Sequence, residues 1–136
     1  MSFTFDFDLT NGVLRCRPHG PVNDEVLRDF FRLGAKYALR TRPAAGIVDL
    51  SEVTSFEVST ETIRELAVSD PVLPDPGPLR IVVAPTAHLF GMMRMFAAHG
   101  EQARPNLHVV HAEKEAWAIL AVTDPQFEPL DATNHT

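Results

Sequence analysis

Apolar and polar side chains alternate at the start of the chain, which is the pattern of a half-buried β-strand. From residue 3 to residue 9 the odd-numbered positions are phenylalanine or leucine and the even-numbered positions are threonine or aspartate. Asn11 and Gly12 then supply the positive φ angles of a tight hairpin turn, and a return strand runs from Val13 to Pro18. The pattern therefore predicts that the chain opens with a β-hairpin.

The rest of the chain alternates between helical periodicity and short apolar runs rich in branched residues. Asn23, Ser59 and Thr86 stand where helix N-caps are expected. This alternation predicts an α/β fold with an open, mostly parallel sheet of about five strands and four helices, in one domain over residues 1–122. Residues 123–136 have no periodicity and predict a loosely ordered C-terminal tail. The predicted helices are 24–40, 60–69, 87–100 and 113–121, and the later strands are 45–50, 79–84 and 107–110.

Composition limits the class of protein. The 136 residues are 45% hydrophobic and 22% charged, which is ordinary for a soluble domain. A net charge of -6 with scattered arginines argues against nucleic-acid binding. The single cysteine, Cys16, excludes a disulfide within the chain, and no leader-like segment or run of 18 apolar residues is present. We expect a cytoplasmic protein that does not span a membrane.

Several polar residues follow predicted parallel strands, whose carboxyl ends meet at one edge of such a sheet. The histidines among them lack the spacing of a zinc site, so we expect no metal. A serine–histidine–aspartate triad would lack its Gly-x-Ser-x-Gly turn, and no phosphate-binding glycine loop is present. We therefore expect a non-enzymatic protein without a cofactor. The candidates at this edge are His19, Asp49, Ser51, His88 and His111.

A family resemblance is sharpest between Ile47 and Leu66, where a strand ending in Asp-Leu-Ser is followed by a polar loop and a serine at a helix N-terminus. This resembles the STAS domain, the fold of bacterial anti-sigma-factor antagonists. Residues 90–96 and 115–120 are similar to a broad set of uncharacterised bacterial STAS-like proteins. The resemblance covers residues 3–122 and implies the same α/β fold that the hydrophobic pattern predicts.

The resemblance also implies a site. In the antagonists the loop carries Asp-Ser-Ser-Gly, and a partner kinase phosphorylates the second serine. Placing the two loops together without gaps puts Ser59 at the phosphoacceptor, while Val58 replaces the first serine and Thr60 replaces the glycine. The other interpretation of Ser59 is a simple N-cap that contributes about 1 kcal/mol. The loop expected to contact a partner or ligand contains Asp49, Ser51, Glu57 and Thr60.

Two functions remain open at this point. In the first, the chain is a non-enzymatic interaction module in bacterial signalling, and a protein with an anti-sigma kinase-like domain docks on residues 51–60. In the second, it binds a small apolar or acidic, lipid-like molecule beneath the methionine-rich helix. Exposed strand edges and apolar helix faces also predict a homodimer. The residues expected to line the pocket of the second function are Thr86, His88, Met92, Arg94 and Met95.

Overall fold

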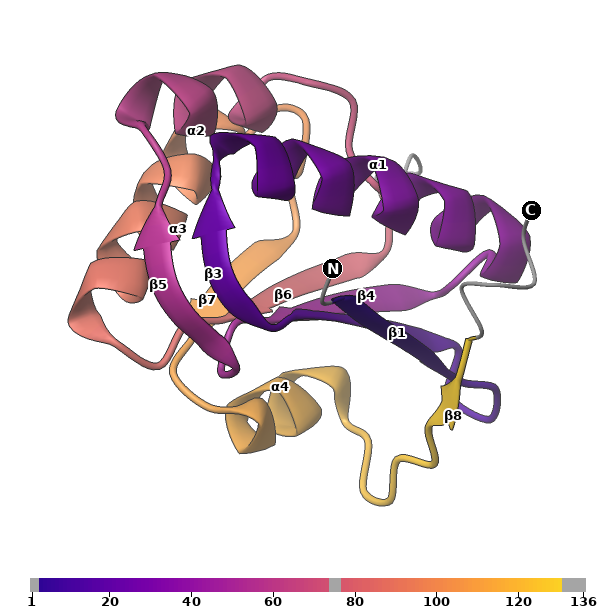
Figure 1. Cartoon of the computed structure of the whole chain (residues 1–136). Coiled ribbons are helices and arrows are strands. Elements are labelled where there is room, and N and C mark those ends of the chain that lie inside the picture. Colours follow the sequence, from indigo (N-terminus) through magenta and orange to yellow (C-terminus); the bar gives the residue numbers. More distant parts are fainter. Residues whose placement is uncertain (1–2, 74–76, 131–136) are drawn as a thin grey trace.

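The computed structural model describes residues 3–73 and 77–130 and shows a mixed sheet with helices on both faces (Figure 1). The main sheet contains β1 (Phe3–Asp8), β2 (Val13–Pro18), β4 (Ala45–Asp49), β6 (Leu79–Val83), β7 (Leu107–Val110) and β8 (Glu128–Pro129). Its order is β7-β6-β4-β2-β1-β8. The four strands from β7 to β2 are parallel, whereas β1 is antiparallel to both of its neighbours. The predicted hairpin is present, and Gly12 adopts φ 69° in its turn.

Two further strands, β3 (Gly20–Asn23) and β5 (Val53–Glu57), form a separate parallel pair. They continue the chain beyond β2 and β4 and lead into the helices that follow (Figure 1). The backbone N–H of Gly20, at φ 82°, donates to the carbonyl of Glu52 at 3.0 Å and ties the starts of the two strands together. This pair places the N-termini of two helices side by side.

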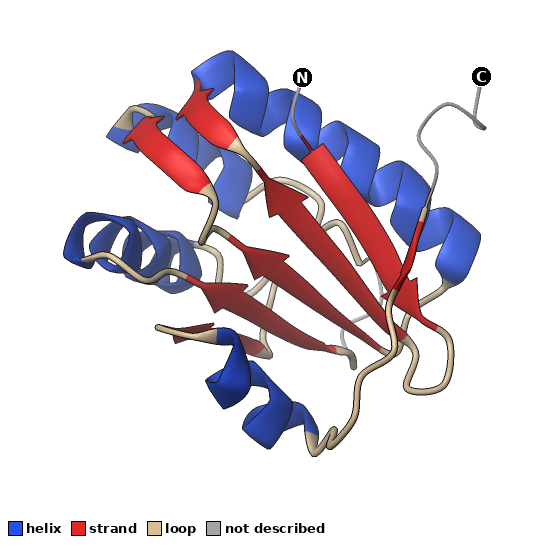
Figure 2. Ribbon diagram, turned by 60° about the horizontal axis from the view of Figure 1, so that its bottom comes forward, coloured by secondary structure: helices blue, strands red, loops and turns tan. Residues whose placement is uncertain are grey.

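The helices divide unequally between the two faces of the main sheet (Figure 2). Three of them, α1 (Asp24–Thr41), α2 (Thr60–Ala67) and α3 (Ala87–His99), lie on one side, which we call the α1 face. Only α4 (Glu113–Leu120) lies on the other side, the α4 face. Within the described ranges no helix has both the length and the apolar character needed to cross a bilayer.

The ends of the helices follow from their capping residues. Asn23, Ser59 and Thr86 each accept a hydrogen bond from the backbone N–H three residues later, at 2.9, 3.1 and 3.2 Å, which confirms the three predicted N-caps. The α4 helix begins differently, because Ala112 has no capping side chain. Instead the carboxylate of Glu115 accepts the N–H of Ala112 at 2.9 Å and that of the preceding residue at 2.7 Å.

The α1 face holds the larger core. Phe5 of β1 stacks on Phe30 and Tyr37 of α1, with ring centroids 5.7 and 4.5 Å apart. Leu14 and Cys16 of β2 are buried in the same cluster. Stacked rings of this kind add to the free energy of burial and hold α1 across the sheet.

The α4 face holds a smaller apolar cluster. Val13, Ile47 and Ile81 lie on neighbouring strands and pack against Ala116 and Trp117 of α4. These strand residues alternate with those of the α1 face, so β2, β4 and β6 have apolar contacts on both sides. For β4 and β6 the apolar runs in the sequence predicted this. One short helix cannot cover the whole of this face, and the rest of it is polar.

Two sequence expectations differ from the structure. The described residues form eight strands where about five were predicted. The additional strands β3, β5 and β8 were not predicted because they have no clear alternating pattern of their own. Residues 128–129 of the predicted loose tail form β8, which pairs with β1, and the N–H of Leu130 donates to the carbonyl of Phe5 at 2.8 Å. The end of the predicted tail, residues 131–136, lies outside the described residues.

Candidate functional site

Ser59 lies exposed where α1 and α2 begin. Its backbone N–H donates to Asp24 Oδ1 at 2.9 Å, and its hydroxyl lies 3.2 Å from Asp24 Oδ2 and 3.0 Å from Thr62 Oγ1. The hydrogen bond from the Ser59 backbone is the main reason why the pKa of Asp24 lies below its usual range. Ser59 is thus both the N-cap of α2 and the link between α1 and α2.

A positive charge lies within reach of the same junction. Arg28 of α1 donates to Thr62 Oγ1 at 3.3 Å and to Glu65 Oε1 of α2 at 2.9 Å. The hydrogen bond with Glu65 raises the pKa of Arg28 above its usual range. Thr62 therefore contacts both Arg28 and Ser59, so the guanidinium is one side chain away from the Ser59 hydroxyl.

The neighbours of Ser59 explain how this loop departs from the antagonist pattern. Val58 is 7% exposed and packs in the core of the α1 face, so an apolar side chain serves burial at this position. Glu57 at the end of β5 and Thr60 at the start of α2 are both exposed. The loop of residues 51–60 is therefore a surface anchored by two buried side chains, Phe56 and Val58.

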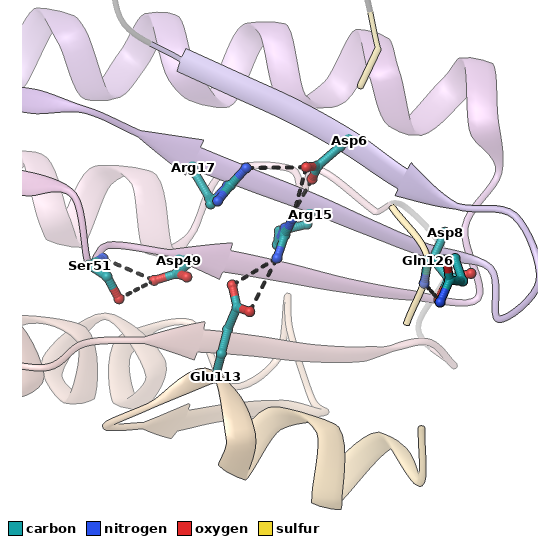
Figure 3. Close-up of polar contacts among 8 residues, drawn as sticks. All are labelled: Asp6, Asp8, Arg15, Arg17, Asp49, Ser51, Glu113 and Gln126. Carbon is teal, nitrogen blue, oxygen red and sulfur yellow. Dashed lines mark hydrogen bonds and ion pairs between the residues drawn. The ribbon is translucent and has the colours of Figure 1, made fainter. Parts of the chain in front are cut away.

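Asp49 and Ser51 face a different neighbourhood from Ser59. Asp49 is 6% exposed at the end of β4, and its Oδ1 accepts both the N–H of Ser51, at 2.9 Å, and the Ser51 hydroxyl. Figure 3 shows that these residues point toward the uncovered part of the α4 face, where charged side chains from β1, β2 and α4 meet. We call this group the polar cluster, and its members are Asp6, Arg15, Arg17, Asp49, Ser51 and Glu113.

Arg15 is the centre of the polar cluster. It donates to both carboxylate oxygens of Asp6, at 3.0 and 2.9 Å, and to both oxygens of Glu113, at 3.2 Å each (Figure 3). Arg17 adds a second guanidinium, 3.2 Å from Asp6 Oδ2. The ring of Phe127 lies 4.0 Å from the Arg15 guanidinium carbon and covers it from the C-terminal segment. Burial works against the charge of Arg15, yet Asp6 and Glu113 raise its pKa above the usual range.

The carboxyl groups of Asp49 and Glu113 lie next to each other and influence each other's pKa. Burial, followed by the hydrogen bond with Asp49, raises the pKa of Glu113 to about 7, although Arg15 acts in the opposite direction. Burial alone would raise the pKa of Asp49 as well, but the hydrogen bonds with Glu113 and Ser51 lower it below its usual range. Two adjacent carboxyls that share a proton behave in this way. The pair can hold one proton near neutral pH.

The residues predicted to line a pocket lie on and around α3. Thr86 caps this helix, and the ring of His88 donates from Nε2 to the carbonyl of Phe56 on β5 at 3.2 Å. Arg94 is exposed, whereas Met92 and Met95 are partly buried against the core. The guanidinium carbon of Arg94 lies 6.0 Å from the ring centroid of Phe90 on the same helix.

An apolar cavity of about 90 Å³ lies between the sheet, α1 and α3, on a different face of α3 from the predicted pocket residues. From α3 it is lined by Met93 and Phe96, and none of the five predicted pocket residues contributes to its lining. The sheet contributes Val48 and Val82, among others, and α1 contributes Phe30. Cavities lined in this way accept apolar groups and exclude water.

The three candidate histidines have separate partners. His19 Nε2 lies 2.6 Å from Thr4 Oγ1, His88 contacts β5, and His111 stacks on Phe90 at 4.1 Å between ring centroids. In the described part of the chain, no three histidine, cysteine or acidic residues are grouped to hold a metal ion. Among the same residues, the hydroxyls of Ser51 and Ser59 contact Asp49, Asp24 and Thr62, and neither contacts a histidine.

Sequence reasoning missed most of the polar cluster. The hairpin did contain a usable signal, because Asp6 pairs directly with Arg15 in the β1–β2 register, and both alternate with apolar residues of the opposite face. Arg17 follows on the same face of β2. Glu113 lies 98 residues from Arg15 in the sequence, so no local pattern connects the two. The buried Arg104 beside the cavity was missed in the same way.

Comparisons with known proteins support the fold. Neither a family model nor a curated protein matches the sequence. Among solved structures the chain is similar to the anti-sigma factor antagonist SpoIIAA in its unphosphorylated form, with a TM-score of 0.58 and 10% sequence identity. The match covers 90% of this chain and 100% of that one. The chain therefore has a STAS-like fold, which confirms the fold that the residues around Ser59 indicated.

Proposed function

We propose that the chain is a regulatory interaction module of the bacterial cytoplasm and that a protein with an anti-sigma kinase-like domain docks on β5 and the start of α2. The observation that carries this proposal is the position of Ser59. The residue is exposed at a helix N-terminus, and its hydroxyl joins α2 to Asp24 of α1. A change at this one atom therefore alters the junction of two helices.

Phosphorylation of Ser59 would exchange the partners of that junction. The dianion would be repelled by the Asp24 carboxylate, which the Ser59 N–H and hydroxyl now contact. It would be attracted by the free N–H groups of the α2 N-terminus and by Arg28, which already contacts Thr62. The starts of α1 and α2 would then separate and re-pair, so the docking surface would change its charge and its shape together.

A photo-cross-linking amino acid at Ser55 tests the docking surface. Ser55 is exposed on β5, and Lys36 is an equally exposed position on α1 that serves as the matched control. In the source cells we expect cross-links to one partner protein from position 55 and not from position 36. Cross-links of equal yield from both positions, or cross-links only to a second copy of the chain, would contradict the proposed docking.

The proposed effect of Ser59 phosphorylation on docking is tested by comparing Ser59→Ala with Ser59→Glu in the same cross-linking strain. We expect Ser59→Glu to lower the yield from position 55 at least fivefold, because it places a negative charge beside Asp24. Ser59→Ala adds no charge and keeps the backbone hydrogen bond to Asp24, so it should retain most of the yield. Intact mass measurement of the protein from its own cells should show one phosphate, mapped to Ser59. Equal yields from the two variants, or a phosphate only at another residue, would refute control of docking by phosphorylation of Ser59.

A second function, the binding of a small apolar or acidic molecule, is favoured by the cavity between the sheet, α1 and α3. Its lining is almost entirely hydrocarbon, and it includes the guanidinium-bearing residues Arg80 and Arg104. Small-molecule sites commonly combine an apolar wall with a few polar groups that fix the orientation of the ligand. This function and docking at Ser59 use different surfaces and do not exclude one another.

A further inference from the structure

Two arginines line the apolar cavity, although arginine is rarely buried in a protein interior. Arg80 of β6 is 6% exposed, and Arg104, in the segment between α3 and β7, is 5% exposed. Arg80 lies on the α1 face because it alternates with Ile81, which packs against α4. Its guanidinium donates to the carbonyl of Leu73 at 2.7 Å and to that of Pro78 at 3.1 Å. Positive charge is thus built into the wall of the cavity.

The contacts of Arg104 are with neutral groups. It donates to the carbonyl of Ala67 at 2.7 Å and to that of Asp70 at 3.5 Å. Its guanidinium carbon lies 4.9 Å from the ring centroid of Phe96 and 5.8 Å from that of Phe31. Over the residues that the structure describes, Arg104 makes no ion pair. Carbonyl dipoles and ring faces stabilise the cation by direct contact, whereas the charge of the Asp70 carboxylate acts on it only from beyond ion-pair distance.

The close packing of the end of α3 against α2 holds Arg104 beside the cavity. Gly100, at the end of α3, passes so close to α2 that a Cβ there would lie 2.5 Å from the carbonyl oxygen of Ala67. That same oxygen accepts the Arg104 hydrogen bond. Burial and the nearby charge of Arg80 lower the pKa of Arg104 to about 10, so the guanidinium is still charged at neutral pH. A buried cation therefore lies in the wall of an apolar cavity.

We propose that this cavity binds a small carboxylate with an unbranched apolar tail, the carboxylate lying at Arg104 and the tail lying against Val82 and Phe30. A guanidinium presents paired donors that match a carboxylate, and the ligand would supply the direct ion pair that Arg104 does not make with any described residue. The size follows from the volume: a cavity of about 150 Å³ holds benzene, so about 90 Å³ suits a tail of about four carbons. This inference rests on the second proposed function and is independent of docking at Ser59.

The test compares pentanoate with pentanamide, which has the same shape without the charge. Titration of the isotope-labelled chain at pH 7, followed by NMR, should show pentanoate binding at least tenfold more tightly, with the largest shifts at residues that line the cavity. Equal affinities would overturn the role of Arg104 while the ligand-binding function stands. Absence of binding by both compounds up to 50 times the protein concentration would overturn the inference and that function together.

Two variants and one control locate the site. Arg104→Met should remove the preference for pentanoate over pentanamide, whereas Arg94→Met removes an exposed arginine of α3 and should retain it. Val82→Phe places a ring in the cavity and should abolish binding of both compounds. A folded spectrum is required of each variant. If Arg104→Met does not fold, the comparison of the two ligands on the unmodified chain still decides the question, and an unchanged preference in a folded Arg104→Met would refute the inference.

Discussion

The two faces of the main sheet are covered differently, one by apolar packing and the other largely by paired charges. The α1 face is covered by three helices and packs phenylalanine, leucine and methionine side chains around a cavity. The α4 face has one helix of eight residues, and beside its small apolar cluster the sheet carries the polar cluster centred on Arg15. Figure 3 shows the charged side chains of β1 and β2 meeting Glu113 at the start of α4, on the part of this face that the helix leaves uncovered.

The difference shows what each face contributes to the free energy of folding. On the α1 face the gain comes from apolar area removed from water, and its weakness is the space that remains empty. On the α4 face each buried charge is stabilised only as long as its partners remain, so the cost of a mutation depends on which partner is lost. The first face has room for a ligand, whereas the second can respond to a proton.

The largest expected effect comes from truncating β2 toward the α1 face. Leu14→Ala should lower the free energy of unfolding by about 4 kcal/mol, because Leu14 is fully buried and already lines the cavity, which would grow. Val13→Ala is the matched control on the opposite face and should cost about 2 kcal/mol. Urea unfolding measures both. A smaller loss for Leu14→Ala than for Val13→Ala would contradict the view that the α1 face holds the main core.

Removing the central acid of the polar cluster should cost nearly as much. Asp6→Ala leaves Arg15 and Arg17 without the carboxylate that both contact, and we expect a loss of about 3 kcal/mol. Asp29→Ala is the control, because its ion pair with Arg32 is exposed and should contribute less than about 1 kcal/mol. Similar losses in the two variants would show that the polar cluster is solvated rather than buried.

The α1 face could be predicted from the sequence because its signals are local. Alternation in β1, helical spacing in α1 and the three N-caps lie within short windows, and the helices and five strands appear close to their predicted bounds. Ser59 was located by its capping position, which the structure confirms. Its role as a phosphoacceptor is not set by local structure, so it stays a prediction.

The α4 face could not be predicted to the same extent, because its contacts join distant segments. The polar positions of β1 and β2 indicated a solvent-facing side, yet Glu113 and Phe127 come from the far end of the chain to cover Arg15. The strands β3, β5 and β8 were missed because they are short and lack alternation. The cavity depends on how α1 and α3 fit together, which no residue pattern encodes.

The carboxyl pair makes the α4 face sensitive to pH. The folded state raises the pKa of Glu113 to about 7 from an ordinary value near 4.5, so it holds a proton that the unfolded chain releases. Stability from this group is full below about pH 4.5 and is lost as the pH rises toward 7 and beyond. The lowered pKa of Asp49 acts in the opposite direction, but in a window below its ordinary value of 3.8.

Glu113→Gln should therefore flatten the loss of stability between pH 5 and pH 8 that we expect in the unmodified chain. Urea midpoints at four pH values across this range measure the slope. Glu115→Gln on the same helix is the control and should leave the slope unchanged, because the pKa of Glu115 is lowered by hydrogen bonds from the backbone of His111 and Ala112. An unmodified chain whose stability rises from pH 5 to pH 8 would refute the shared proton.

The smallest expected effect concerns the C-terminal segment that completes the α4 face. Phe127 covers the guanidinium of Arg15 and lies 5.6 Å from the ring of Trp117, so Phe127→Leu should cost about 1 kcal/mol through the loss of a cation–π contact and ring packing. The backbone N–H of Leu130 is bonded to β1, so the free energy of local opening measured by its hydrogen exchange should fall by a similar amount. Substitution of the exposed Gln126 side chain by alanine is the control, since only its backbone N–H contacts Asp8. If Phe127→Leu changes neither value, the segment rests on the sheet without stabilising the polar cluster, and Arg15 is held by Asp6 and Glu113 without it.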